Sequence, residues 1–141
     1  MGLCYAAWVA STELDSALST IRTVAQGHAG LTLLVLHGSR ARGDAREDSD
    51  WDFVYLAEPA FDASLLYADL AIALTTDHVD VANLATAGGL MRYRVARDGI
   101  VVLEAEPGEF DRFWFAAVSF WCDAEPVLRA GYKDVLGGLG R

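Results

Sequence analysis

The stretch from Leu36 to Leu56 reads LHGSRARGDAREDSDWDFVYL, and the rest of the chain is interpreted around it. Two small residues, Gly38 and Ser39, are followed by a polar segment and then by Asp50 and Asp52, which precede an apolar run. Glycine lets a backbone approach a phosphate closely, and the first backbone N–H groups of a helix favour an anion. The stretch therefore predicts a strand, a turn that holds phosphate, and a second strand that carries acids.

The two acids point to a metal. Residues i and i+2 of a strand face the same side, so Asp50 and Asp52 are expected to project together. Two neighbouring carboxylates repel each other unless a cation lies between them, and Mg²⁺ usually binds one or two carboxylates together with phosphate oxygens. The alternative is a solvated acidic strand start, which the spacing from Gly38 and Ser39 disfavours.

A third acid is expected further along the chain. Residues 78–84 read HVDVANL, and their alternation predicts a strand that carries Asp80. A pair of metal ions can activate an attacking oxygen and stabilise the leaving one. Asp80 is our candidate to bind the second metal and to accept the proton of the attacking hydroxyl. The alternative for Asp80 is a surface acid on an edge strand, and we interpret Asp77 as a loop residue.

The elements around this stretch predict an α/β (α+β) domain of about four strands. Residues 31–36 form a continuous apolar run, as expected for a strand buried on both faces. Apolar spacing predicts a helix from Ser11, and residues 1–10 fit a short strand, a helix start or a contact surface. The other predicted strands are 51–56, 78–84 and 100–104, and the other helices are 64–74, 90–97 and a long C-terminal helix from 108 to 136. Pro126 is expected to kink or split that last helix, and residues 136–141 to form a loose tail.

Composition narrows the class of protein. The 141 residues are 53% apolar and carry a formal net charge of -9, which suits a single domain over residues 1–141 and argues against direct nucleic-acid binding. A nucleotide enzyme remains compatible, because Mg²⁺ supplies positive charge locally. The two cysteines, Cys4 and Cys122, lack zinc-ligand spacing. We expect no membrane segment and a cytoplasmic location, because no apolar run is long enough to cross a bilayer and the first residues lack a basic signal-peptide region.

The segment GSRARGDAREDSDWDFV resembles the signature of the DNA polymerase beta-like nucleotidyltransferase superfamily. It is most similar to the minimal nucleotidyltransferase (MNT) branch, whose pattern is G-S-x-A-R-G-x5-S-D-x-D. The fixed positions are all met here, by Gly38, Ser39, Ala41, Arg42, Gly43, Ser49, Asp50 and Asp52. HVDVANLA resembles the strand of the family that carries the third acid, which places Asp80. The order of the elements and the short length fit the same branch, so the resemblance covers most of the chain.

This resemblance implies a nucleotidyltransferase fold, with a mixed central sheet packed by helices. It also implies transfer of AMP from ATP with Mg²⁺, as two ions, and release of pyrophosphate. Members of the branch are commonly antitoxins that adenylylate a tyrosine of a partner HEPN-domain ribonuclease toxin. Gly38 and Ser39 would then hold the triphosphate, Asp50, Asp52 and Asp80 would bind metal, and Asp80 would also act as base. Arg42 matches the motif, either as a nucleotide-binding residue or as a packing residue.

Two other functions stay open at this point. Related nucleotidyltransferases modify small molecules such as aminoglycosides, but they are generally longer. A binding-only antitoxin would cover its toxin without chemistry, and the intact motif disfavours it. Among other residues, Arg40 and Arg46 are interpreted as exposed charges and His37 as a packing or hydrogen-bonding residue, whereas His28 and His78 receive no role. Phe115 and Cys122 lie off the apolar stripe of the last helix and could mark a partner surface.

Overall fold

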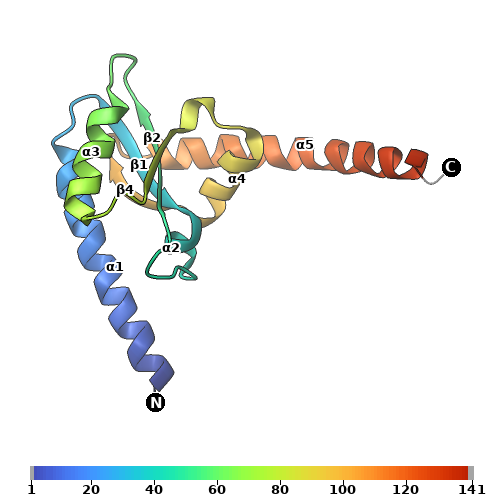
Figure 1. The fold of residues 1–141 in the computed structure, drawn as a ribbon. Coiled ribbons are helices and arrows are strands. Elements are labelled where there is room, and N and C mark those ends of the chain that lie inside the picture. Colours follow the sequence, from blue (N-terminus) through green and yellow to red (C-terminus); the bar gives the residue numbers. More distant parts are fainter. Residues whose placement is uncertain (1, 140–141) are drawn as a thin grey trace.

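The structure of the chain is a computed structural model that describes residues 2–139, with side chains from Ser11 onward. The elements, in chain order, are α1 (Gly2–Gln26), β1 (Leu31–His37), α2 (Gly38–Arg42), β2 (Trp51–Ala57), α3 (Ala63–Leu74), β3 (Val79–Asn83), the 3₁₀ helix η1 (Leu84–Thr86), α4 (Gly89–Asp98), β4 (Ile100–Glu104) and α5 (Glu109–Leu139) (Figure 1).

The strands form one mixed sheet in the order β3-β2-β1-β4. β1 is antiparallel to both β2 and β4, whereas β2 and β3 are parallel and are joined through α3. The central position of β1 explains its sequence, because residues 33–36 are completely buried and belong to the cores on both faces of the sheet. The four-stranded mixed sheet and the long C-terminal helix confirm the expected fold class.

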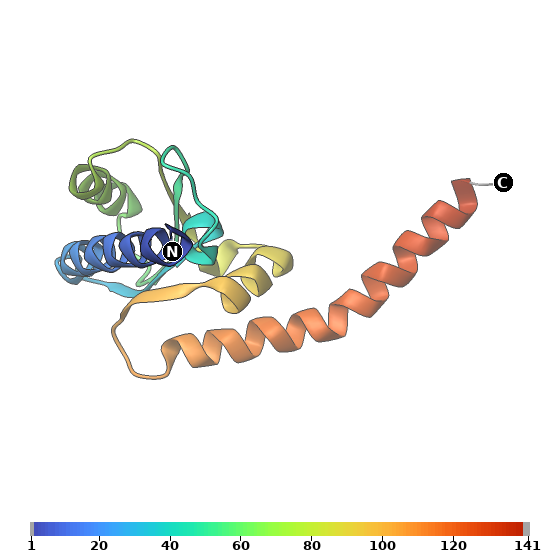
Figure 2. The same ribbon diagram turned by 90° about the horizontal axis from the view of Figure 1, so that it is seen from below.

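Each face of the sheet has its own core. α1 and α3 cover one face, and α4 and α5 cover the other, as Figure 2 shows. The first core contains Ile21, Ala25, Leu34, Leu36, Phe53, Leu66 and Leu70. The second core contains Leu33, Val35, Val54, Leu84, Val95, Ala96, Phe113 and Ala117. Because successive strand residues alternate between these cores, the core that a residue joins identifies the face of its neighbours at i±2.

The first core gives a stability prediction. Leu66 of α3 is completely buried, whereas its neighbour Leu65 is 60% exposed. Leu66→Ala should lower the free energy of unfolding by about 2–5 kcal/mol, because it removes buried methyl groups and leaves a cavity. Leu65→Ala is the matched control and should stay within about 0.5 kcal/mol of the wild type. Urea unfolding of both variants measures this difference, and equal losses would contradict the packing described for α3.

Several predicted boundaries are wrong. α1 begins at Gly2 rather than Ser11, so residues 2–10 take the helical alternative. The strand expected to run to Leu84 ends at Asn83, because the Asn83 side chain accepts a hydrogen bond from the Ala85 N–H and starts η1. Met1 lies outside the described residues.

α5 is longer than predicted. It continues through Pro126 without a break and runs to Leu139, through most of the expected loose tail; residues 140–141 lie outside the described part. Figure 2 shows that the helix bends along its length and projects beyond the sheet, and an internal proline, which removes one backbone hydrogen bond, is a usual cause of bending. Within residues 2–139, neither α5 nor any other helix has the length and apolarity needed to cross a membrane.

Candidate active site

A glycine turn joins β1 to the short helix α2. Gly38 has φ +73°, in the left-handed region that favours glycine. A Cβ atom at Gly38 would collide with the Asp52 carboxylate, since it would lie 3.2 Å from Asp52 Cγ and closer still to one oxygen. α2 ends at Gly43, whose φ is +84° and whose N–H donates to the Ser39 carbonyl at 3.0 Å. The turn therefore brings the backbone at Gly38 directly against the acid side chain of the next strand.

The register of the sheet aligns three polar residues on adjacent strands. His37 of β1 pairs with Asp52 of β2, and Asp52 pairs with Asp80 of β3. Residues directly paired across strands project to the same face. That face is the one covered by α4 and α5, because Val35, Val54 and Ala82, two residues along each strand, pack in the second core. The structure thus places Asp52 beside Asp80, and Asp50 lies two residues before Asp52.

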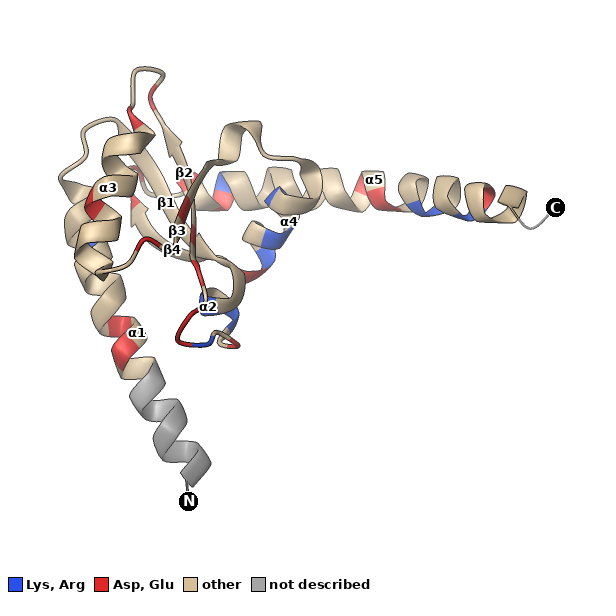
Figure 3. Cartoon of the chain, viewed as in Figure 1, with Lys and Arg blue, Asp and Glu red and all other residues tan. Residues whose placement is uncertain are grey.

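The three acids influence one another electrostatically. Burial raises the pKa of Asp52 above its ordinary value, and the negative charges of Asp50 and Asp80 raise it further, against the lowering effects of His37 and Arg42. A carboxyl whose pKa is raised by neighbouring carboxylates lies where a cation is stabilised. The local field is also mixed. Figure 3 shows acidic positions on β2 and β3 and basic positions on α2 and α4, and Arg42 of α2 is the basic residue that acts on Asp52, although the whole chain is strongly acidic.

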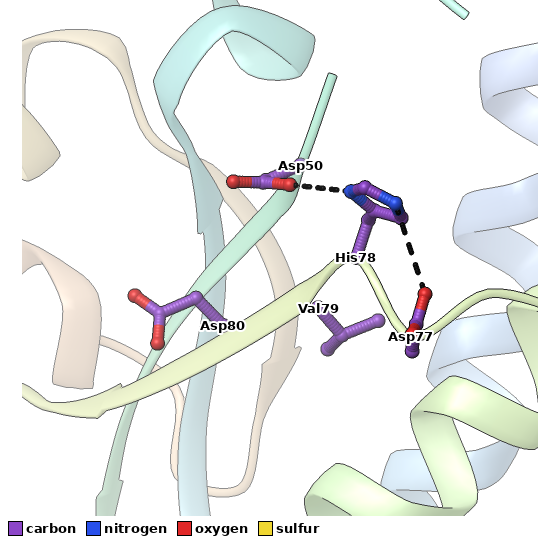
Figure 4. A pocket seen from close by; sticks show the side chains of 5 residues that line it. All are labelled: Asp50, Asp77, His78, Val79 and Asp80. Carbon is purple, nitrogen blue, oxygen red and sulfur yellow. Dashed lines mark hydrogen bonds and ion pairs between the residues drawn. The ribbon is translucent and has the colours of Figure 1, made fainter. Parts of the chain in front are cut away.

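Asp50 has a partner that the sequence did not suggest. The His78 imidazole donates from Nδ1 to Asp50 Oδ1 at 3.1 Å, and its Nε2 lies 3.7 Å from Asp77 Oδ1. Asp50, Asp77, His78, Val79 and Asp80 line an open cavity of about 220 Å³. In Figure 4 the Asp80 side chain points away from His78 and Asp77. His78 precedes Asp80 by the same two residues by which Asp50 precedes Asp52, and this shared offset on two parallel strands is the signal that could have identified it.

The two arginines of α2 have different surroundings. Arg40 stacks over the Trp51 ring at 4.3 Å and donates to the Ser49 carbonyl from Nε at 3.1 Å and from Nη2 at 2.7 Å. It therefore clamps the loop between α2 and β2, and its interpretation as a merely exposed charge is wrong. Arg42 contacts Asp44 at 3.5 Å and is close enough to Asp52 to lower the pKa of that carboxyl. Its guanidinium thus contributes positive charge to the acid cluster.

Ser49, His37 and His28 differ in their contacts and in their distance from the acids. The Ser49 hydroxyl accepts from the Arg46 N–H at 2.7 Å, and its carbonyl holds Arg40. Burial lowers the pKa of His37, and its Nε2 is buried without a hydrogen-bond partner among the described residues. His28 pairs with Asp69 of α3 at 2.9 Å, on the other face of the sheet from the acids. His37 adjoins the acids, whereas His28 does not.

The donor set fits Mg²⁺. Carboxylate oxygens are the hard ligands that this ion prefers, and the ion usually keeps waters and substrate phosphates as its other ligands. In residues 11–139, no three His, Cys, Asp or Glu side chains are drawn together closely enough to enclose a metal by themselves. The Gly38 backbone lies directly against the Asp52 carboxylate, so a phosphate bound at this turn would lie beside that acid. The residues therefore suit an ion that arrives together with a phosphate-bearing substrate.

Comparisons with known proteins identify the family and the fold of the chain. The family model for polymerase beta nucleotidyltransferases matches residues 19–107. The protein adenylyltransferase MntA of Aphanizomenon flos-aquae is 35% identical over 95 residues, which cover 59% of this chain and 63% of the relative. The alignment thus spans less than two thirds of that relative's length.

Solved structures share the fold. A chain from a toxin–antitoxin crystal structure with AMP-PNP superimposes with a TM-score of 0.70 at 24% identity, covering 84% of this chain and 98% of the other. A chain from the complex of tri-AMPylated Shewanella oneidensis HEPN toxin with MNT antitoxin gives 0.67 at 22% identity, covering 87% and 98%. The family model spans more than half of the sequence and includes β1 to β4 with the acids, so this chain belongs to the polymerase beta nucleotidyltransferase family.

Proposed function

We propose that this chain is a Mg²⁺-dependent protein adenylyltransferase that transfers AMP from ATP to a tyrosine of a partner HEPN-domain ribonuclease toxin. It would silence the toxin in the cytoplasm as its antitoxin, with residues 1–141 acting as a single nucleotidyltransferase domain. The observation that carries the proposal is the juxtaposition of Gly38, Asp52 and Asp80 at one end of the sheet. The named activity of the MntA relative and the AMPylated toxin in the Shewanella complex support the choice of acceptor.

The substrate would be held by the turn and the acids. The backbone at Gly38 and Ser39 would accept the triphosphate, with Arg42 adding positive charge beside it. Asp50, Asp52 and Asp80 would hold two Mg²⁺ ions, which when bound neutralise the charge that develops on the phosphates. Asp52 is the most enclosed of the three carboxylates, and its raised pKa is relieved by a cation at this position.

Asp80 would act as the base. Its side chain lies on the acid face and points away from the His78–Asp77 pair (Figure 4). It would accept the proton of the tyrosine hydroxyl while the phenolic oxygen attacks the α-phosphorus of ATP. A new O–P bond forms, the bond between the α-phosphorus and its bridging oxygen breaks, and pyrophosphate leaves. The enzyme supplies position and charge compensation, as is usual in phosphoryl-type transfer.

Mass spectrometry tests this proposal directly. The purified HEPN partner, incubated with the chain, ATP and Mg²⁺, should gain one or more AMP masses on tyrosine, and EDTA should prevent the gain. Unmodified toxin, together with AMP transfer to an aminoglycoside, would instead support a small-molecule enzyme. If an Asp50→Asn/Asp52→Asn double variant still protected cells from the toxin, coverage rather than chemistry would be the mechanism.

His78 gives a prediction about metal binding. Because it holds Asp50 Oδ1, it leaves the other oxygen of that carboxylate for the metal. His78→Ala should raise the Mg²⁺ concentration that AMP transfer requires by about 10- to 100-fold, the usual effect on metal affinity of removing a residue that orients a metal ligand. The Mg²⁺ concentration at half-maximal rate measures this. His78→Asn keeps a donor and should recover part of the loss, whereas an unchanged Mg²⁺ requirement in His78→Ala would exclude this role.

A further inference from the structure

A regular seam of residues runs along α5, from the part packed on the domain to the exposed outer part. The seam has two rows, and in each row the residues are seven positions apart. The two rows alternate along the helix, so that neighbouring seam residues are three or four positions apart. The large row is Trp114, Trp121, Leu128 and Val135, and the small row is Ala117, Ala124, Gly131 and Gly138. Alternating three- and four-residue spacing is the pattern by which one helix packs lengthwise against another. We call these eight residues the α5 seam.

The inner part of the seam is partly covered by the chain itself, although Trp114 at its start is 44% exposed. Ala117 is 2% exposed in the second core, and Trp121 stacks on Tyr93 of α4 at 5.3 Å between ring centroids. The neighbouring Phe120 lies so close to Gly89 that a Cβ atom there would meet its ring. The inner seam is therefore a helix-to-helix interface between α5 and α4.

The outer part of the same seam is open. Every residue from Pro126 to Leu139 is exposed, with Leu128 at 60% and Val135 at 62%. At the usual helical rise, residues 122–139 extend about 27 Å, and Figures 1 and 2 show this part projecting away from the sheet. The seam thus continues, in the same register, from a covered interface onto an uncovered surface.

The composition of the outer part of α5 indicates that another helix packs against it in the functional state of the protein. Pro126, Gly131, Gly137 and Gly138 are the residue types least favourable inside a helix, so propensity does not hold this segment helical in water. Packing of an apolar face normally provides most of a helix's stability. Glycine in the small row also lets a second helix approach closely. Because the inner part of the same seam packs against the helix α4, we expect a helix to pack against its outer part as well.

The charge of the chain favours a different protein over a second copy. A net charge of -9 makes two copies repel each other. The seam also begins on the face of the sheet that carries the acids, because Ala117 packs with Val35 and Val54, which lie two residues along their strands from His37 and Asp52. The outer seam therefore extends outward from the side of the sheet that carries the acids, and Figure 1 shows α2 and α4 in the angle between α1 and α5.

We infer that the outer α5 seam is the docking surface for an apolar-striped helix of the partner protein that carries the acceptor tyrosine. The inference rests on the proposed function for the identity of that partner. It replaces the expectation that Phe115 and Cys122 mark the partner surface. Both are exposed, but Phe115 stands on a part of α5 whose other side is covered by the domain, and neither belongs to the repeat.

Charge insertion into the seam tests the inference. A tagged HEPN-domain partner is co-expressed with the full chain, and the affinity of the purified pair is measured. Leu128→Glu/Val135→Glu should weaken the complex by about 100-fold or more, because it places carboxylates at the centre of the interface. Ala130→Glu is the matched control, since it adds the same side chain to an exposed position on the opposite side of α5 and should leave affinity unchanged.

The outcomes separate docking from chemistry. Wild-type affinity in the double seam variant would overturn the docking site. Light scattering of the chain alone that showed a dimer, lost in the double variant, would overturn it in favour of a second copy. Asp52→Asn is expected to bind the partner normally while losing AMP transfer. A wild-type complex that forms through the seam yet transfers no AMP would leave the docking site standing and remove the proposed function.

Discussion

Asp52→Asn should reduce AMP transfer about a thousand-fold while leaving the folded chain as stable as the wild type or more stable. The loss follows from removing a ligand of the metal that offsets phosphate charge, an effect of about 4 kcal/mol on the transition state. α-Labelled ATP and the partner protein measure the rate. Asp48→Asn, an exposed acid of the preceding loop, is the matched control and should transfer AMP at the wild-type rate.

The stability half of this prediction comes from the pKa of Asp52. Burial and the charges of Asp50 and Asp80 raise that pKa, so the folded chain binds the proton more tightly than the unfolded chain does. Ionisation of Asp52 therefore costs folding free energy, and the cost grows as the pH rises through the unfolded and folded pKa values. Asparagine removes this cost. In metal-free buffer near neutral pH the variant should melt at or above the wild-type temperature.

Mg²⁺ should reverse the order of the two melting temperatures, so that the wild type melts above Asp52→Asn. An ion that binds only the folded state raises the melting temperature of the wild type, and the increase grows with the logarithm of the ion concentration above its dissociation constant, whereas the variant gains less. A variant that melts far below the wild type without metal would show that Asp52 is structural. Wild-type labelling by the variant would show that it is not a metal ligand.

Gly38→Ala is the second change with a large expected effect. Alanine at φ +73° costs roughly 1–2 kcal/mol, and its methyl group would push the Asp52 carboxylate away from its position. Displacement of a reacting group by about 1 Å can cost about a hundred-fold in rate, and we expect a loss of at least that size. The kinetics of AMP transfer measure the loss of rate, and the melting temperature of the variant measures the loss of stability from backbone strain.

Gly43→Ala separates backbone strain from the collision. Gly43 has a similar φ of +84°, but apart from its neighbours along the chain no described atom lies within 4 Å of the position of an added Cβ. This control should lose a comparable amount of stability and keep most of the activity. If both alanine variants were equally inactive, strain in the turn rather than contact with Asp52 would explain the loss.

The sequence predicted the sheet well because its strands are unambiguous in pattern. Residues 31–36 form a continuous apolar run that predicts a doubly buried strand, and the alternation of residues 78–84 predicts a strand that carries Asp80, as the structure shows. The motif spacing predicted that Gly38 and Asp52 belong to one site. Their direct approach depends on the pairing of His37 with Asp52, which a spacing along the chain does not specify.

The sequence missed what depends on the register between separate elements. His78 meets Asp50 only because β2 and β3 are parallel and aligned at Asp52 and Asp80. Arg40 clamps a loop through carbonyl oxygens, which every residue possesses and no pattern reveals. The apolar stripe of α5 was visible, but periodicity does not say how far along the helix the domain covers it.

The Arg40 clamp has a consequence for how the site opens. Asp52 lies in the paired sheet next to the completely buried Phe53, and Asp80 pairs with it from the edge strand β3. Exposing the backbone amide of Asp52 to exchange with solvent therefore requires the adjacent core to open. Residues 43–50 are mostly exposed and are held by Arg40 through a few carbonyl contacts. We expect this loop, which includes Asp50, to open while the pairing of β2 with β3 stays intact. Under the proposed function, entry of nucleotide and escape of pyrophosphate would then require only a local opening. Asp52 and Asp80 would keep their alignment, and Asp50 would return to its place when the loop closes.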